Sequence, residues 1–227
     1  MCACRGSQSA HDPDRGAHRR HGIAHTEDVA FTVLYVCTGN VCRSPTAELL
    51  FRGWADPAPD VTVSSAGLQA LVGHGIDHSS AAALGELGID PSRHRARQFE
   101  PWMATDADLI LTASREHRDQ VMTELPSFYK RIFTMKEFAR LVNGVEPSEP
   151  AAVVAAAAAR RGQGPRVAPE DDDVRDPYRG AINHAKTIAE EIAETVYATL
   201  DALGFAAERW VHTPPARENR SARPTPY

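Results

Sequence analysis

The sequence predicts a single α/β domain of three layers, a central four-stranded parallel sheet with helices on both faces. Two features carry this prediction. Short β-branched and aromatic segments alternate with helical ones, which is the order that parallel sheets require. The short segments are also apolar at consecutive positions, as strands buried on both faces are. With 227 residues the chain is long enough for one such core and two tails.

Each element follows from its local sequence. The strands are predicted at residues 31–36, 61–65, 108–112 and 131–134. The helices are predicted at residues 45–52, 79–87, 114–124, 135–142 and 180–203. Ser44 is a candidate N-cap with Pro45 at the first helical position, and Gly88 is a candidate C-cap.

The last helix carries an apolar stripe, so we expect it to lie on the sheet. The members of the stripe are Ile182, Ala185, Ile188, Ala189, Ile192, Val196, Leu200 and Leu203. The stretch before this helix interrupts the alternating pattern, although residues 151–161 can form a short helix. We interpret the acidic run Asp171–Asp173 as a solvated charge cluster.

Composition changes mark the limits of the domain. Residues 29–210 form the predicted domain, and residues 143–173 are a surface insertion within it. Residues 1–28 are polar and lack periodicity, so they are expected to be a disordered leader. Residues 211–227 are rich in Pro and Arg and are expected to be a disordered tail.

Composition also argues against several classes of protein. The formal net charge of −5 gives no basis for a nucleic-acid partner. No stretch approaches the run of about 20 apolar residues that a membrane helix needs. The first residues contain no apolar region typical of a secretion signal, and four cysteines are too few for a disulfide framework in a chain of this length. We therefore expect a cytoplasmic protein without nucleic-acid or membrane partners.

The stretch VCTGNVCRSP, residues 36–45, has the features of a phosphate-binding loop. Ligands of open α/β sheets bind beyond the carboxyl ends of the strands, near helix N-termini. Backbone N–H groups there favour an anion. Gly39 permits unusual backbone angles and Asn40 tolerates the left-handed region. Arg43 adds a planar guanidinium that can hold two oxygens of a tetrahedral anion.

Cys37 lies at the floor of this predicted loop. A helix N-terminus, amide donors and a guanidinium all favour the thiolate over the thiol. A thiolate there is placed to attack phosphorus, and the Ser44 hydroxyl could donate to it. For an isolated C-x5-R pattern, the simpler interpretation is that Cys37 ends a buried strand and Arg43 is an exposed residue at a helix start. The position after a strand, Gly39 and the Ser-Pro pair favour the phosphate loop.

Residues 36–45 closely resemble the signature of the low-molecular-weight protein tyrosine phosphatases, and the likeness extends over about residues 30–205. It includes Ser65-Ala66-Gly67, His94–Gln98 and Asp176-Pro177-Tyr178, of which the middle segments give weaker support. The resemblance implies hydrolysis of phosphotyrosine in proteins through a phosphocysteine intermediate, without a cofactor or a metal. It implies phosphotyrosine-containing proteins as partners, with a tyrosine kinase among the candidates.

The resemblance also implies a role for each site residue. The catalytic residues would be Cys37, Arg43 and Asp176. The residues that bind phosphate would be Thr38, Gly39, Asn40, Val41, Cys42, Arg43 and Ser44. The loop would be supported by Asn40, Ser44, Ser65 and His94. The substrate slot would have Tyr178 and Leu71 as its walls.

The expected reaction itself requires a group that can give and take a proton, and the carboxyl group of Asp176 could do both. A departing phenolate needs a proton, and the water that attacks phosphocysteine needs a base. The alternatives remain that Asp176-Pro177 is a simple turn, that His94 is an ordinary surface histidine and that Tyr178 is a packed surface tyrosine.

The sequence departs from the family pattern in ways that leave substrate preference open. Leu71 lies in a stretch where many relatives have an aromatic residue, and Arg179 stands where many have a second tyrosine. The insertion at residues 143–173 is longer than the family leads us to expect, and it is close in sequence to Asp176.

Two other functions fit parts of the sequence. Arsenate reductases on the same fold share the oxyanion loop but relay oxidation through downstream cysteines, and no cysteine follows Cys42. A reductase coupled to a small-molecule thiol stays open. A non-catalytic phosphate-binding module would be expected to lack Cys37, Arg43 or Asp176, and all three are present. Cys42 either fills space or captures oxidised Cys37 as a reversible disulfide.

Overall fold

The computed structural model describes residues 30–55 and 61–206, and these form the predicted α/β architecture. The predicted leader at residues 1–28 and tail at residues 211–227 lie outside the described residues. Four parallel strands form one sheet in the order β2-β1-β3-β4. The strands are β1 (Phe31–Cys37), β2 (Val61–Gly67), β3 (Leu109–Thr112) and β4 (Ile132–Thr134). The first strand therefore lies inside the sheet, with its carboxyl end between those of β2 and β3.

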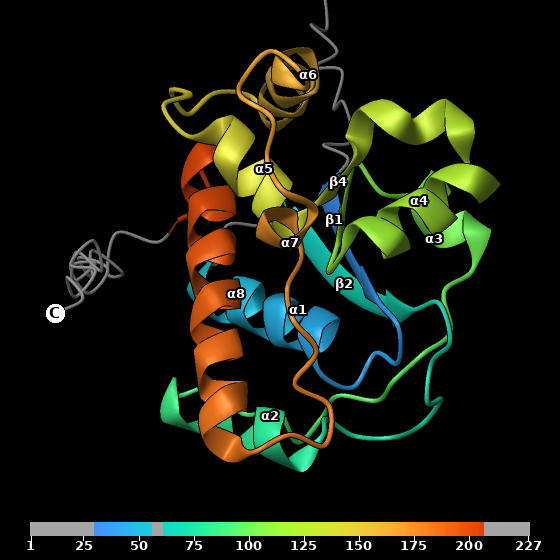
Figure 1. The fold of residues 1–227 in the computed structure, drawn as a ribbon, viewed down its shortest axis with the longest axis vertical. Coiled ribbons are helices and arrows are strands. Elements are labelled where there is room, and N and C mark those ends of the chain that lie inside the picture. Colours follow the sequence, from blue (N-terminus) through green and yellow to red (C-terminus); the bar gives the residue numbers. More distant parts are fainter. Residues whose placement is uncertain (1–29, 56–60, 207–227) are drawn as a thin grey trace, which may run out of the picture.

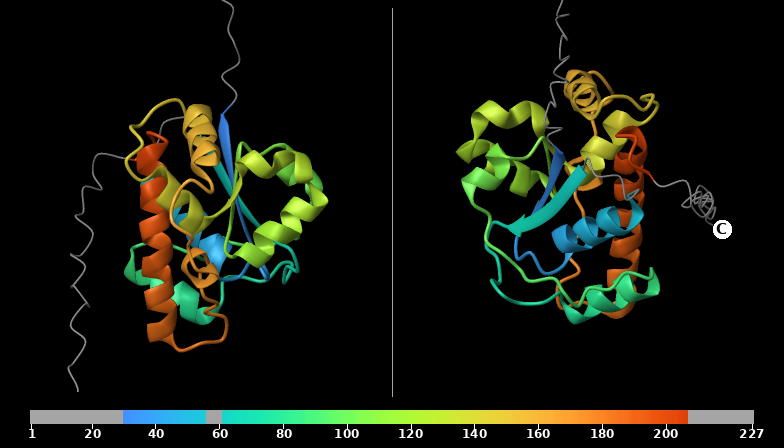
Figure 2. Two further views of the ribbon diagram at one scale, coloured as in Figure 1. Left: turned by 45° about the horizontal axis from the view of Figure 1, so that its top comes forward. Right: turned by 180° about the vertical axis from the view of Figure 1, so that it is seen from behind.

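Helices cover both faces of the sheet, which confirms the three predicted layers (Figures 1 and 2). The helices on the first face are α1 (Arg43–Trp54), α2 (His78–Glu86), α5 (Met135–Val142) and α8 (Ile182–Ala202). The elements on the opposite face are α3 (Pro101–Thr105), α4 (Arg115–Glu124) and the 3-10 helix η1 (Pro126–Arg131). Two further helices, α6 (Pro150–Arg160) and α7 (Pro169–Asp172), lie next to α5. Within the described ranges, no helix is long and apolar enough to cross a membrane.

The strands feed two separate cores, which explains their continuous apolar character. Successive side chains of a strand point to opposite faces of a sheet. Val33 and Tyr35 of β1 therefore join the core beneath α1 and α8, whereas Leu34 and Val36 join the core beneath α3 and α4. All four side chains are at most 1% exposed.

The long helix α8 lies differently from the prediction. Its main neighbours are α1, α2 and α5 rather than the strands, because these helices already cover much of that face of the sheet. Most of the predicted stripe is buried in the same core as β1 and β3, but Ile182 at the first position of the helix is 41% exposed. The stripe therefore predicts burial correctly and the buried partner incorrectly.

The segment expected as a surface insertion contributes to the main core. Its predicted short helix is present as α6, and Val153 and Ala157 on that helix are fully buried. The acidic run was expected to be solvated, but Asp172 at the end of α7 is only 2% exposed and forms ion pairs with Arg115 and Arg140. These partners lie 57 and 32 residues away along the chain, so the local sequence did not reveal them.

Burial of α6 predicts that Val153→Ala destabilises the fold by about 1.5–3 kcal/mol, because two methyl groups leave a closed core. Chemical denaturation of the variant measures the loss. The matched control is Val72→Ala, which makes the same change at a side chain that is 65% exposed. Equal stability of the two variants would mean that α6 is not part of the cooperative core.

Candidate active site

The loop between β1 and α1 begins at the carboxyl end of an inner strand and runs directly into a helix. Cys37 is the last residue of β1, and α1 begins at Arg43 with Cys42 as its N-cap. The prediction of Ser44 as N-cap is therefore wrong. Ser44 lies within the first turn, where its hydroxyl accepts from Asn40 Nδ2 at 2.9 Å and lies 3.0 Å from Cys37 Sγ. The Ser44 hydroxyl therefore contacts residues of the loop and does not cap the helix.

Within the described residues, the loop contains several hydrogen-bond donors that have no acceptor in the protein. Among the described residues, the backbone N–H groups of residues 38–42 have no protein acceptor. The Nε of Arg43 is buried and also lacks one. A buried donor without a partner costs about 1–3 kcal/mol. Together with the positive end of the α1 dipole, these donors suit a ligand with several anionic oxygens.

Asn40 shapes the loop through hydrogen bonds of its side chain and its carbonyl. Its side chain is fully buried, and Nδ2 donates to Ser44 Oγ and to Ser65 Oγ at 2.9 and 2.8 Å. Its Oδ1 accepts from the backbone N–H of Arg97 at 2.9 Å, and its carbonyl accepts from His94 Nε2 at 2.8 Å. The contacts expected of Ser65 and His94 are therefore both present.

The left-handed residue of the loop is Asn40, with φ at 54°. Gly39 does not adopt a positive φ, and a Cβ there would make only ordinary contacts with Val41 and Leu71. The glycine that sterics require is Gly67, where a Cβ would lie 2.5 Å from the carbonyl oxygen of Thr38. The end of β2 must be glycine here because the loop passes directly over it.

Segments far from the loop support it from behind. Ser65 Oγ donates to Glu48 Oε2 at 2.5 Å, and Glu48 also accepts from Arg52, so a polar chain runs from the loop into α1. Arg97 Nε donates to the carbonyl of Ser65, and Gln98 brackets the residues after β2 through Leu68 and Ala70. Residues 94–98, which gave weaker support to the family resemblance, therefore hold both the loop and β2 through hydrogen bonds.

Sequence reasoning missed His117. This side chain is 6% exposed on α4, and its Nε2 lies 2.8 Å from Thr38 Oγ1 while Nδ1 lies 2.7 Å from Ser114 Oγ. Burial, followed by the nearby charge of Arg43, lowers the pKa of His117 to about 4, so the ring is neutral near neutral pH. The Ser-x-x-His spacing after a buried strand was the available signal, because it places both residues at a helix start beside the loop.

Asp176 comes from the far end of the chain to the same place. Its Oδ2 accepts from Arg43 Nη2 at 3.0 Å, and its Oδ1 accepts from the backbone N–H of Tyr178 at 3.2 Å. The Asp176 side chain is 52% exposed, whereas that of Arg43 is 8% exposed. Arg43 Nη2 also lies 3.3 Å from Thr38 Oγ1. One guanidinium therefore links the loop, through Thr38, to the Asp-Pro-Tyr segment.

The proposed slot residues are apolar and accessible. Leu71 is 37% exposed and Tyr178 is 40% exposed. Leu71 donates its N–H to the carbonyl of Gly39 at 3.0 Å, so the Leu71 segment runs along the loop. Arg179, where many relatives have tyrosine, has its guanidinium 5.0 Å from the centre of the Tyr178 ring and adopts a positive φ of 53°.

Cys42 differs from Cys37 in its surroundings. Both are buried free thiols, and Cys42 packs with Val41 and Ala96. Burial raises the pKa of Cys42 to about 12, so this residue stays a thiol near neutral pH. The thiol of Cys42 therefore adds no negative charge to the loop.

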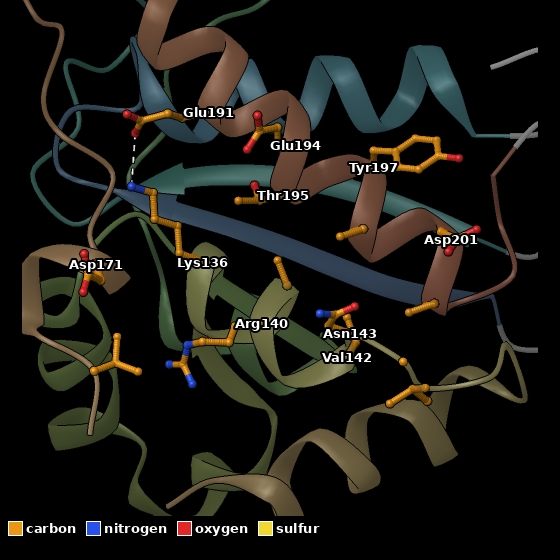
Figure 3. Close-up of a pocket in the computed structure, with 16 residues that line it drawn as sticks. Lys136, Arg140, Val142, Asn143, Asp171, Glu191, Glu194, Thr195, Tyr197 and Asp201 are labelled. Carbon is orange, nitrogen blue, oxygen red and sulfur yellow. Dashed lines mark ion pairs between the residues drawn. The ribbon is translucent and has the colours of Figure 1, made fainter. Parts of the chain in front are cut away.

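A separate cavity of about 890 Å³ lies between α5, α8 and the insertion (Figure 3). Lys136 and Arg140 extend into it from α5, and Glu191, Glu194 and Asp201 extend into it from α8. None of the predicted site residues lines this cavity. The predicted site residues therefore lie outside this cavity, around the loop between β1 and α1.

Comparison with known proteins agrees with this geometry. Residues 32–150 match the family model described as low molecular weight phosphotyrosine protein phosphatase. A relative from Ralstonia nicotianae, named probable low molecular weight protein-tyrosine-phosphatase EpsP, is 30% identical over 75% of this chain and 92% of its own length.

Solved structures show the same fold. A low molecular weight protein tyrosine phosphatase from T. tengcongensis is 30% identical, with a TM-score of 0.56 over 75% of this chain and 98% of its own. The YwlE arginine phosphatase from Geobacillus stearothermophilus is 25% identical, with a TM-score of 0.59 over 77% of this chain and 93% of its own. The chain therefore belongs to the low molecular weight phosphotyrosine protein phosphatases, a family of phosphoric monoester hydrolases.

Proposed function

We propose that this protein hydrolyses phosphotyrosine in proteins, with Cys37 as nucleophile and Asp176 as general acid and base. The contact that carries the proposal is the one between Arg43 and Asp176, 3.0 Å long. It brings a carboxyl group to the mouth of a loop that is rich in unpaired donors, with a cysteine at its floor. A nucleophile, an oxyanion cradle and a proton donor are the three groups that the reaction needs.

The first step transfers the phosphoryl group to sulfur. The thiolate of Cys37 attacks phosphorus while the bond from phosphorus to the tyrosine oxygen breaks. The loop amides and Arg43 hold the phosphoryl oxygens, and Arg43 exchanges its contact with Asp176 for one with phosphate. Protonated Asp176 gives its proton to the departing phenolate oxygen, which leaves as tyrosine.

The second step returns the enzyme to its starting state. The carboxylate of Asp176 takes a proton from water, and the oxygen of that water attacks phosphorus. The bond between sulfur and phosphorus breaks, and inorganic phosphate forms. The Ser44 hydroxyl, 3.0 Å from Cys37 Sγ, stabilises the departing thiolate.

The walls of the slot support an aryl substrate. Leu71 and Tyr178 are exposed apolar side chains, and a tyrosine ring buries apolar area against such surfaces. A phosphorylated guanidinium is more polar than a phenyl ring, so placing it against these apolar side chains carries a larger desolvation cost. Phosphotyrosine-containing proteins, tyrosine kinases among them, are therefore the proposed partners, acting in the cytoplasm.

The purified protein is expected to hydrolyse p-nitrophenyl phosphate at mildly acidic pH and to prefer a phosphotyrosine peptide to a phosphoarginine peptide. Cys37→Ser is expected to abolish turnover and to retain binding of inorganic phosphate, because the cradle remains. Phosphate release and calorimetry measure the two properties. Preference for phosphoarginine, or arsenate-dependent oxidation of thiols without phosphatase activity, would replace the proposed function by another.

Asp176→Ala is expected to slow hydrolysis of phenyl phosphate by about 10²–10⁴-fold, the usual contribution of a general acid. The loss is smaller for p-nitrophenyl phosphate, whose leaving group needs little protonation. Steady-state kinetics on both esters measure the difference. A wild-type rate on phenyl phosphate would remove Asp176 from the mechanism.

Cys42 is proposed as the redox partner of Cys37. Peroxide converts the Cys37 thiolate to a sulfenic acid, and Cys42 condenses with it to give a disulfide and water. Two thiols of dithiothreitol then reduce the disulfide. In Cys42→Ala the sulfenic acid has no such partner, and a second peroxide oxidises it to a sulfinic acid that dithiothreitol does not reduce. We therefore expect peroxide-treated wild type to recover activity with dithiothreitol and Cys42→Ala to lose it permanently. Equal recovery of both proteins would assign Cys42 to packing alone.

A further inference from the structure

The segment ahead of Asp176 is anchored by one buried carboxylate. The Oδ2 of Asp172 accepts from Arg115 Nη2 and Nε at 2.5 and 3.1 Å, and its Oδ1 accepts from Arg140 Nη2 at 2.8 Å. The Asp172 side chain is 3% exposed. Arg115 begins α4 and Arg140 lies on α5, so a single residue ties α7 to two helices on opposite faces of the sheet.

The next two residues, Asp173 and Val174, are also held by hydrogen bonds. Asp173 Oδ1 accepts from the backbone N–H of Arg115 at 2.7 Å, at the N-terminus of α4. Val174 is 1% exposed, its N–H donates to the carbonyl of Ala113 at 2.8 Å, and its own carbonyl accepts from Arg43 Nη1 at 3.3 Å. The chain is therefore fixed up to a point two residues before Asp176.

Asp176 itself has little support of its own. Its side chain is half exposed and contacts only Arg43 and the backbone of Tyr178 within the described structure. In the proposed reaction Arg43 passes to the phosphate, which removes one of these two contacts. The position of the carboxyl group then depends on the backbone, which is held by the ion pairs of Asp172 together with the hydrogen bonds of Asp173 and Val174.

The charge of Asp172 persists at the pH of an assay. Burial alone would raise the pKa of this carboxyl group, but hydrogen bonds and charges from Arg140 and Arg115 outweigh burial, so its pKa lies below the usual value. Loss of the negative charge would leave Arg115 and Arg140 without their shared anionic partner, and breaking such a pair is costly.

We propose that Asp172, with Arg115 and Arg140, is a positioning residue for the reaction, holding the Asp176 carboxyl group where it meets the leaving oxygen. This role rests on the proposed function of Asp176. A displacement of about 1 Å can cost up to about 10²-fold when it misaligns reacting groups. Arg140 also lines the cavity of about 890 Å³ (Figure 3), and its side chain is 43% exposed, so the ion-pair cluster is open to solvent on the side of Arg140.

The role predicts a signature in leaving-group dependence. A well-placed general acid makes kcat/KM nearly insensitive to the acidity of the leaving phenol. A misplaced acid penalises esters of weakly acidic phenols and spares activated ones. Asp172→Asn, which keeps shape and removes charge, is expected to lower kcat/KM about 10–30-fold on phenyl phosphate and about threefold or less on p-nitrophenyl phosphate.

Glu137 provides a matched control. It is a second buried carboxylate, 4% exposed as a residue, and it is held by Arg118 and Arg161, neither of which hydrogen-bonds to residues 172–178 in the described structure. Glu137→Gln is expected to lose comparable stability and to keep the wild-type dependence on the leaving group. Arg140→Gln is a second test. It is expected to cost less stability because the Arg140 side chain is 43% exposed, and it should show a weaker form of the Asp172→Asn effect.

A double mutant tests whether Asp172 acts through Asp176. In the Asp176→Ala background, Asp172→Asn is expected to add no further penalty on phenyl phosphate. An equal loss on both esters, or an undiminished loss in that background, would overturn the positioning role. If Asp176→Ala keeps the wild-type dependence, the general acid is misassigned and both proposals fall. If it steepens the dependence while Asp172→Asn and Arg140→Gln do not, only the positioning role is overturned.

Discussion

The hydrogen bonds of Asn40 are the constraint on which the site depends. A loop that points its N–H groups at a ligand must give up the backbone pairing that would otherwise hold it. Asn40 replaces that pairing with four contacts, to Ser44, Ser65, Arg97 and His94. It accepts a left-handed backbone at φ 54° to make them. The loop can therefore be rigid although its own donors are kept free for a ligand.

The parallel sheet supplies the rest of the arrangement. Its topology brings the carboxyl ends of β1, β2 and β3 to one edge, so Cys37, Gly67 and the start of α4 become neighbours. Arg43 then connects this edge to the segment that carries Asp176, and the ion pairs of Asp172 connect the same segment to α4 and α5. The half-exposed carboxyl group of Asp176 therefore follows a segment that is held by the buried carboxylate of Asp172.

Local patterns predicted elements better than their surroundings. The strand and helix alternation, the short helix at α6 and the buried stripe of α8 all follow from periodicity, which reflects local burial. The same patterns failed on Ser44, on Asp172 and on the packing partner of α8. A serine before Pro is a plausible N-cap and an acidic run is ordinarily solvated, so both predictions followed local frequency where distant partners decided the outcome.

The sequence by itself determined the fold class, the phosphate loop and the family, because residues 36–45 carry the strand end, the loop and the helix start in one contiguous stretch. Only the tertiary structure decided that His117 lies against Thr38, that residues 94–98 brace the loop and that Asp172 anchors the segment of Asp176. Those contacts join residues 54–79 positions apart along the chain. The packing of helices across the sheet decides which residues meet in these contacts. Such long-range packing produces no periodic pattern in the local sequence.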